Sequence, residues 1–245
     1  MNNKAWADRI IQKLDPSFKQ RWDAYNELIT SYMAKESIWV DIGCGDNFSV
    51  ETFGSKARLA VGIDLLLPQH KTAALFICGD IRHLPISSEI ADLVTLRFVV
   101  EHLPYIPSDF TEIERILKPG GYIVMITPNL WSPFVFVAQL LPSVLKRKIL
   151  HALYTVDESE VIPTYHLLNT PSQIRKGIGK LKPVRLEFVQ GASYVRRWLF
   201  LIFFLWHLFT KKGFVKVLRD NLLAVFIKDS LLVFLFIHFY LPGDI

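Results

Sequence analysis

The nine residues WVDIGCGDN, from Trp39 to Asn47, constrain the fold of this chain more than any other segment. Apolar and aromatic residues run into Asp41, and Gly43 and Gly45 follow with one residue between them. An apolar run that ends in glycines predicts a strand followed by a sharp turn, because glycine has no side chain to hinder the turn or the approach of a ligand. The segment therefore predicts a sheet with a ligand at the end of this strand.

Apolar runs alternate with helical patterns through the first half of the chain. Strand-like runs cover 37–43, 58–64, 73–80, 90–98 and 122–129, and helix-like segments cover 4–14, 20–35, 47–57 and 107–121. Strands that are apolar throughout and separated by helices are typical of a parallel sheet covered on both faces. Two further runs, 182–190 and 221–228, are predicted as closing strands. We therefore expect an α/β fold with a doubly wound, mostly parallel, Rossmann-like sheet and helical, apolar C-terminal insertions.

Composition and pattern divide the chain into five segments. We expect a helical cover at 1–36, a ligand-binding core at 37–130, a lid at 131–181, closing strands around an apolar, basic helix at 182–228, and an apolar tail at 229–245. Residues 1–141 carry 13 Lys/Arg and 16 Asp/Glu, whereas residues 142–245 carry 15 and 7. An acidic front part and a basic, apolar back part indicate two different tasks.

The turn at Gly43 and Gly45 is poorly suited to a diphosphate. The dinucleotide-binding pattern has a third glycine three residues after the second, but here Asp46, Asn47 and Phe48 follow Gly45. Asp41 adds a negative charge that would repel a phosphate. A cationic or amine-bearing ligand fits this turn better.

Five motifs in order resemble those of class I S-adenosylmethionine-dependent methyltransferases, specifically the broad small-molecule group labelled type 11. They are VDIGCGDN, GID ending at Asp64, CGDIRHLP, DLVTLRFVVEHL and ILKPGGYIVMITPN, and together they cover roughly residues 37–130. The first motif of the family usually has a third glycine where this chain has Asn47, the non-glycine residue that best tolerates a left-handed backbone. The resemblance implies a Rossmann-like methyltransferase sheet and S-adenosylmethionine as the cofactor.

The resemblance also assigns residues to the cofactor. Asp64 is expected to hold the ribose hydroxyls, and Asp80 with Ile81 to flank the adenine. The other expected cofactor positions are Asp41, Gly43, Cys44, Gly45, Leu65 and Arg97, with Arg21 from an N-terminal helix pairing with the carboxylate. Asp64 follows Gly43 by 21 residues, the spacing at which the terminal acid of a second strand reaches a ribose. The alternatives are that Asp64 and Asp80 are turn acids, that Cys44 is a packed thiol and that Arg21 is solvated.

The acceptor must be aligned with the methyl–sulfur bond, and a hydroxyl acceptor also needs a base. The chain lacks the Asn/Asp-Pro-Pro-Tyr motif of amide methylation and a Pro-Cys after the fourth strand. The candidate bases are His102, just beyond that strand, and His166, in the lid segment, with a hydrogen-bonded structural histidine as the alternative for each. Glu101 is expected to orient a loop. We expect a hydroxyl on a small or lipid-linked acceptor, and no metal site.

The segment WLFLIFFLWHLF, residues 198–209, is apolar but too short to cross a bilayer. Arg196, Arg197, Lys211 and Lys212 flank it, a pattern typical of a helix lying in an anionic membrane surface. We expect peripheral membrane contact through 196–212 and through the apolar run 231–241. A packed substrate lid and a homodimer interface are the alternatives. Long aliphatic runs between the basic residues argue against nucleic acid.

The start of the chain has no apolar run of signal-peptide length, and Cys44 and Cys78 fit a reducing compartment. We therefore expect a cytoplasmic methyltransferase that is peripheral on the inner membrane face. The rival hypothesis is a non-catalytic module of the same fold that docks to a membrane or senses the cofactor. A dehydrogenase is disfavoured by the missing third glycine and by Asp41.

Overall fold

The core is a seven-stranded sheet in the computed structural model, which describes residues 2–142, 145 and 163–229. The strands lie in the order β3-β2-β1-β4-β5-β7-β6. β7 is antiparallel to both of its neighbours, and all other neighbouring strands are parallel. Their bounds are β1 Ile38–Ile42, β2 Leu59–Asp64, β3 Phe76–Cys78, β4 Ala91–Arg97, β5 Leu117–Pro128, β6 Leu181–Val189 and β7 Asn221–Lys228. The expected mostly parallel α/β sheet is confirmed.

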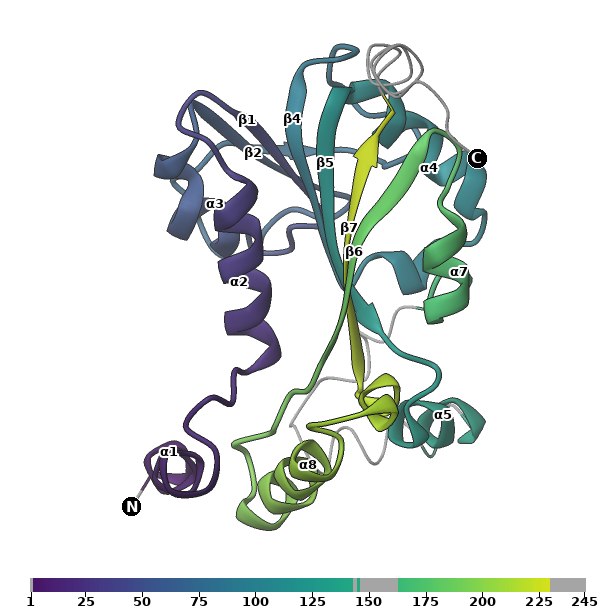
Figure 1. Ribbon diagram of the computed structural model, residues 1–245. Helices are drawn as coiled ribbons and strands as arrows, with labels where there is room; N and C mark the ends of the chain where they lie inside the picture. The colour runs from purple at the N-terminus through teal and green to yellow at the C-terminus, as the bar shows by residue number, and fades with distance from the viewer. Residues whose placement is uncertain (1, 143–144, 146–162, 230–245) are drawn as a thin grey trace, which may run out of the picture.

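Helices cover both faces of the sheet (Figure 1). One face carries α2 (Arg21–Tyr32) and α3 (Phe48–Phe53), and the other carries α4 (Ile106–Ile116) and α7 (Pro171–Lys176). The buried residues of α2 are Tyr25, Leu28 and Ile29, and those of α4 include Ile106, Phe110 and Ile113. Both sets recur every three or four residues, which places them on one side of each helix and against the sheet.

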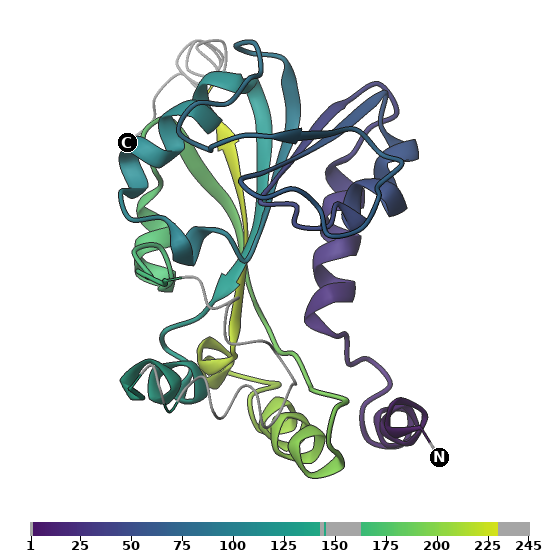
Figure 2. The ribbon, with the colours of Figure 1, turned by 180° about the vertical axis from the view of Figure 1, so that it is seen from behind.

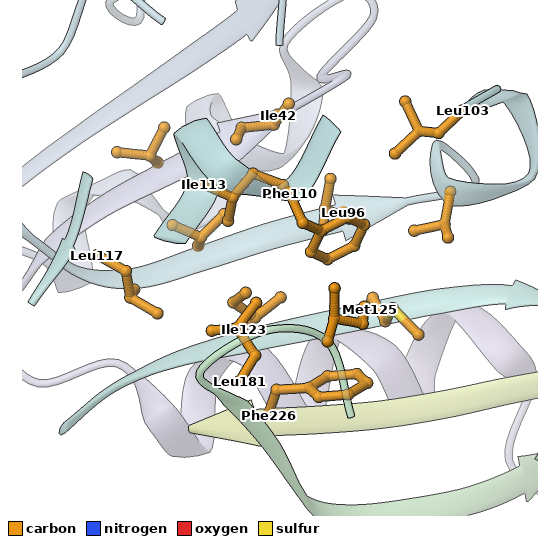
Figure 3. Packing of buried hydrophobic residues seen from close by; sticks show 14 of the residues in the cluster. Ile42, Leu96, Leu103, Phe110, Ile113, Leu117, Ile123, Met125, Leu181 and Phe226 are labelled. Carbon is orange, nitrogen blue, oxygen red and sulfur yellow. The ribbon is translucent and has the colours of Figure 1, made fainter. Parts of the chain in front are cut away.

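Successive residues of the central strands face opposite sides of the sheet, as the two-residue period of a strand requires. Ile123 and Met125 of β5 lie in one cluster with Phe110 and Ile113 of α4, as Figure 3 shows. Their neighbour Val124 packs on the opposite face, in the cluster that contains the buried side of α2. The sheet is therefore buried on both faces, which explains why its strands appear in the sequence as continuous apolar runs.

The helix expected over 107–121 is shorter than predicted. α4 ends at Ile116, and residues 117–121 already belong to β5. The Pro-Gly-Gly signal in this segment instead accompanies a register shift between β4 and β5. Gly120, with a φ of 79°, takes the backbone through this irregularity.

Three helices gather at one end of the sheet, beyond the end of β5 (Figures 1 and 2). They are α1 (Asn3–Leu14), α5 (Pro133–Leu140) and α8 (Arg197–Phe209). α1 and α8 come from opposite parts of the chain and share an apolar cluster that includes Ala7, Phe200 and Phe204. A ligand at the carboxyl ends of the parallel strands would therefore lie between the sheet and these helices.

A buried polar link also joins α1 to α8. Asp15, directly after α1, accepts hydrogen bonds from His207 Nε2 and Lys211 Nζ, each 2.8 Å long. Burial by itself would raise the pKa of Asp15, but the hydrogen bonds from Lys211, Ser17 and His207 outweigh it and hold this pKa well below its usual range. Burial lowers the pKa of His207, so this histidine is neutral at pH 7 and donates through Nε2–H.

Within the described ranges, no helix is long and apolar enough to cross a membrane. Residues 221–228 form the closing strand β7, as expected. The apolar run 231–241, together with residues 143–144 and 146–162 of the expected lid, lies outside the described residues.

Candidate cofactor and acceptor site

The glycine turn directly follows β1, at the edge where the parallel strands end. Gly43 and Gly45 have φ values of 68° and 55°, in the left-handed region that favours glycine. A Cβ added at Gly43 would lie 2.2 Å from Val99 Cγ2, whereas one added at Gly45 would meet nothing within 4 Å. Gly43 is therefore needed for packing as well, whatever its contact with the cofactor. Its missing side chain makes room for Val99, and Gly45 is the glycine with an unobstructed side.

Asn47, in the position of the family's third glycine, has a φ of 64° and is completely buried. Its Nδ2 donates to Leu75 O at 3.2 Å and to Thr72 Oγ1 at 3.3 Å, so it fastens the turn to the loop before β3. A Cβ at Gly62 of β2 would lie 2.0 Å from Asn47 Oδ1. The larger residue at position 47 is therefore accommodated by a glycine on the neighbouring strand.

Asp41 lies in β1 with only 2% of its surface exposed. Thr95 Oγ1 donates to Asp41 Oδ1 at 2.5 Å, and Trp39 Nε1 donates to Thr95 Oγ1 at 2.8 Å. Asp41 Oδ2 has no hydrogen-bond partner among the described residues. Burial raises the pKa of Asp41 to about 6, although Thr95 and Arg97 oppose the shift. A buried carboxylate oxygen without a partner fits a cationic group such as an ammonium.

Asp64 ends β2 beside the glycine turn. Gly45 N donates to its Oδ2 at 2.8 Å and Leu66 N donates to its Oδ1 at 3.1 Å. The half-exposed carboxylate therefore lies next to the unobstructed side of Gly45, where a ribose diol could reach it. Leu65, the next residue, is exposed, as are Leu66 and Leu67.

Asp80 follows β3, on the outer side of the same edge. Its carboxylate accepts hydrogen bonds from the Arg82 side chain, with Nη2 at 2.6 Å from Oδ2, and these bonds hold the pKa of Asp80 below its usual value. An adenine amino group at Asp80 would therefore share this carboxylate with Arg82. Ile81 packs against the hydrophobic core and is only half-buried.

The start of α2 contacts the end of β4 through aromatic and guanidinium groups. The rings of Trp22 and Phe98 meet edge to face, with centroids 5.3 Å apart. The Arg21 guanidinium lies 4.9 Å from the Trp22 ring centroid, and that of Arg97 lies 5.7 Å from it. A Cβ at Gly191 would lie 2.9 Å from Arg21 Cδ, so the segment after β6 packs against this arginine. Two cations are thus held close to one aromatic ring, where α2 meets the end of β4.

The two cysteines differ in their surroundings. Cys44 is buried in the glycine turn, and burial raises the pKa of its thiol to about 12. A thiol with so high a pKa is unreactive at neutral pH, so Cys44 serves packing. Cys78, at the end of β3, is exposed.

A cavity of about 1160 Å³ lies next to this edge, between the sheet and α1, α5 and α8. Its apolar lining includes Ile11, Phe18, Phe98, Phe134, Val135 and Phe203. Its polar lining includes Arg21, Glu101, His102, His166 and Asp220. A large, mostly apolar cavity with a few polar groups has the character of a small-molecule site.

The structure brings both candidate histidines to this cavity. His102 is half-buried, and its Nδ1 lies 2.7 Å from Pro163 O, so Nδ1–H donates and Nε2 is deprotonated in the neutral ring. His166 is buried and has a φ of 53°. Its backbone N–H donates to Glu101 O at 3.2 Å, which anchors the lid segment to the short 3-10 helix Val100–His102 that follows β4.

Glu101, expected only to orient a loop, lines the same cavity and is 4% exposed. Thr127 Oγ1 donates to Glu101 Oε2 at 3.1 Å. Burial raises the pKa of Glu101 to about 7. The signal for Glu101 in the sequence is an acid a few residues after an apolar strand, whereas its burial depends on the contacts of the folded chain.

The chain is similar to known methyltransferases. Residues 40–125 match the family model described as "Methyltransferase domain". The ubiquinone/menaquinone biosynthesis C-methyltransferase UbiE of Cupriavidus pinatubonensis is 29% identical over 36% of this chain and 38% of its own length. A demethylmenaquinone methyltransferase of Staphylococcus epidermidis is 28% identical over 45% of this chain and 56% of its own length. The matched part thus spans about half, or less, of these relatives.

Solved structures share the fold at lower identity. The YcgJ protein of Bacillus subtilis superimposes with a TM-score of 0.52 and 13% identity, covering 84% of this chain and 99% of that one. Geranyl diphosphate C-methyltransferase of Streptomyces coelicolor, solved with S-adenosyl-L-homocysteine, gives 0.52 and 14%, covering 84% and 78%.

The residues at the carboxyl ends of β1 and β2 also fit the cofactor of these proteins. Asp41 Oδ2 offers a buried acceptor for an ammonium, and Asp64 lies beside the unobstructed side of Gly45. The five sequence motifs, the strand order and the family match all indicate the same methyltransferase fold. Residues 40–125 therefore match, in sequence and in fold, a methyltransferase domain of the class I, type 11 family, whose cofactor is S-adenosylmethionine.

Proposed function

We propose that this protein transfers the methyl group of S-adenosylmethionine to a hydroxyl of a small or lipid-linked acceptor, at a membrane surface. One observation carries the proposal. The segment after β4 forms a wall shared by the glycine turn and the large cavity, since Val99 contacts Gly43 while Phe98 and Glu101 line the cavity. A methyl group held at the turn is thereby placed next to a space large enough for an acceptor.

The acids at the carboxyl ends of β1, β2 and β3 each have a proposed part in holding the cofactor. Asp41 binds the ammonium group, Asp64 the ribose hydroxyls, and Asp80 with Ile81 the adenine. Arg21 and Arg97, whose guanidinium groups both lie close to the Trp22 ring, are proposed to bind the carboxylate. The cofactor supplies a methyl group that is already activated by its cationic sulfur. The protein therefore has to orient the acceptor and exclude water.

The proposed acceptor is apolar over most of its length. Phe and Val side chains of α5 and α8 line part of the cavity, and Glu101 and Asn221 are polar lining groups next to β4 and β7. An acceptor with an apolar tail and a polar head would place its head toward β4 and β7. The names of similar proteins support this class, because they include C- and O-methyltransferases of ubiquinone biosynthesis.

Membrane contact is proposed for the outer side of α8. The inner side of this helix buries Leu199, Phe200 and Phe204, while Trp198, Leu201, Ile202, Leu205 and Phe209 stay exposed. Trp198 and Leu205, one on each half of the helix, are 54% and 59% exposed. Exposed apolar residues at this spacing form a continuous stripe, which is unusual on a freely soluble surface.

Charge at the ends of α8 suits an anionic surface. Arg196, Arg197 and Lys212 are exposed there, and Lys216 with the exposed Phe214 follows in the next turn. Lys211 differs from them, because it is committed to buried Asp15. The four exposed cations, rather than the four flanking residues expected from sequence, are proposed to meet anionic headgroups, each contributing about 1 kcal/mol.

Two measurements test the catalytic part. Calorimetry should detect binding of S-adenosylmethionine and of S-adenosylhomocysteine, and not of NAD. Incubation of the protein with methyl-labelled S-adenosylmethionine and a lipid extract of the source cells should then label a product that mass spectrometry identifies. Cofactor binding without transfer to lipid or small-molecule extracts would favour the non-catalytic module.

Flotation with vesicles tests the membrane part. The protein should float with phosphatidylglycerol-containing vesicles at low salt and less at high salt. Replacing Arg196, Arg197, Lys212 and Lys216 with Gln should reduce flotation, and replacing Trp198 and Leu205 with Ser should do the same while cofactor binding persists. Absence of flotation by the wild type would assign the stripe to a lid contact or a homodimer, which light scattering would separate.

A further inference from the structure

Glu101 lines the cavity close to the glycine turn, and the assignment of cofactor and acceptor sites leaves its carboxylate without a role. We propose that Glu101 is the catalytic base that takes the proton from the acceptor hydroxyl, a role that rests on the proposed methyl transfer. The bases expected from the sequence are His102 and His166, and Glu101 directly precedes the first of them. The proposal moves the role of base to Glu101.

Geometry places Glu101 at the wall between cofactor and acceptor. It lies in the short 3-10 helix Val100–His102, two residues after Val99, which fills the space beside Gly43. Its side chain lines the cavity, together with Phe98 of the same segment. A group at this wall can reach an acceptor atom that approaches the methyl group from the cavity.

Two buried polar side chains hold the Glu101 carboxyl in place. Asn169 Nδ2 donates to Thr127 Oγ1 at 2.6 Å, and Thr127 Oγ1 donates to Glu101 Oε2 at 3.1 Å. Thr127 and Asn169 are both completely buried. The backbone of Glu101 is fixed as well, because its carbonyl accepts the N–H groups of Tyr165 and His166. A base held in this way keeps its orientation throughout the reaction.

The proposed step balances without a further reactant. The acceptor O–H bond breaks and its proton passes to the Glu101 carboxylate, while an oxygen lone pair forms the new bond to the methyl carbon. The methyl–sulfur bond breaks with its electron pair on sulfur, which becomes a neutral thioether. The proton on Glu101 is then released to solvent through the cavity.

The ionisation of Glu101 suits this role at neutral pH. Burial raises its pKa to about 7, close to the value at which a general base is most effective. The other ionisable groups that line the cavity are Lys4, Asp8, Arg21, Asp23, His102, His166, Tyr194 and Asp220. Burial also raises the pKa of Asp220, which is occupied by hydrogen bonds from Ser132 and Gln190.

The test compares three variants in the labelled transfer assay with the lipid extract. Glu101→Gln keeps the shape and the Thr127 contact but cannot take a proton, so transfer should fall by roughly 100-fold or more. Glu101→Asp should retain part of the rate. Glu36→Gln, on an exposed turn, is the matched control and should leave the rate unchanged.

The pH profile separates a base from a structural carboxyl. The wild-type rate should rise as pH increases through about 7, and Glu101→Gln should lose this inflection while calorimetry still shows wild-type affinity for S-adenosylmethionine. A Glu101→Gln rate within threefold of wild type would overturn the assignment and leave the proposed function standing. Failure of the wild type to transfer any methyl group would overturn both.

Discussion

The two sides of the site are built in different ways. On the cofactor side, the glycine turn, Asp41 and Asp64 are held by hydrogen bonds between neighbouring strands. On the acceptor side, α1 and α8 come from opposite parts of the chain and meet through Asp15 and an apolar cluster. The cofactor side combines buried Asp41 with half-exposed Asp64, whereas the acceptor side ends in the exposed stripe of α8.

This difference reflects what each side has to recognise. The cofactor is the same molecule throughout the family, so a few residues at fixed spacing suffice to hold it. The acceptor side must form a large apolar space, and helices added around a common sheet are a way to provide one. Substitutions on the cofactor side should therefore weaken cofactor binding, whereas substitutions on the acceptor side should disturb the assembly of the cavity.

The largest loss of stability is expected for a substitution in the glycine turn, on the cofactor side. Gly43→Val adds a side chain that collides with Val99 at a left-handed backbone position, so stability should fall by about 3 kcal/mol or more. Gly45→Ala meets no neighbour and should cost only about 1–2 kcal/mol through backbone strain. Thermal melts of both variants would measure this. Equal losses would show that packing against Val99 is unimportant.

On the acceptor side, a comparable loss of stability is expected when the buried contact between Asp15 and α8 is broken. Asp15→Asn removes the charge that holds Lys211 and the strongest acceptor for His207, so the free energy of unfolding should fall by about 2–3 kcal/mol. The lowered pKa of Asp15 means that its contribution is present above its ordinary pKa of 3.8 and is lost as the pH falls further. The difference between wild type and variant should therefore shrink in acid. Exposed Asp8→Asn is the control.

Much of the cofactor side was predictable from the sequence, and little of the acceptor side was. The strand ends and the spacing from Gly43 to Asp64 are local patterns, and the structure brings these two residues to one edge. Asp15, His207 and Lys211 carry no such signal, because their contact depends on how distant helices pack. The contact of Val99 with Gly43 is likewise not evident from the sequence. It comes from the pairing of β1 with β4, which a residue pattern does not reveal.

A smaller effect, of opposite sign, is expected at Glu101. Its folded-state pKa of about 7 lies above the ordinary value of 4.5, so stability is lost as pH rises through this interval. Glu101→Gln should therefore stabilise the protein by about 2 kcal/mol at pH 8 and by much less at pH 5. Denaturation at the two pH values measures the difference. A variant less stable than wild type at pH 8 would show that the carboxylate supports the fold rather than weakening it.

The smallest effect separates two adjacent lysines on the acceptor side. Lys211→Gln breaks the contact with Asp15 and should cost about 1 kcal/mol, whereas Lys212→Gln should change stability by less than about 0.5 kcal/mol. Flotation should show the reverse order, because Lys212 is exposed and Lys211 is occupied. If the two substitutions changed stability and flotation equally, the distinction between a structural and a membrane-facing cation would be lost.

Calorimetric titration of S-adenosylhomocysteine into the wild type, Asp64→Ala and Asp64→Asn tests the central claim most directly. Asp64 is held beside Gly45 at the edge assigned to the ribose, and losing two hydrogen bonds to an ionised group should cost about 2–4 kcal/mol. Asp64→Ala is therefore expected to bind roughly 30-fold to 1000-fold more weakly, with Asp64→Asn between it and the wild type. Unchanged affinity in both variants, or wild-type binding of NAD instead, would contradict the account.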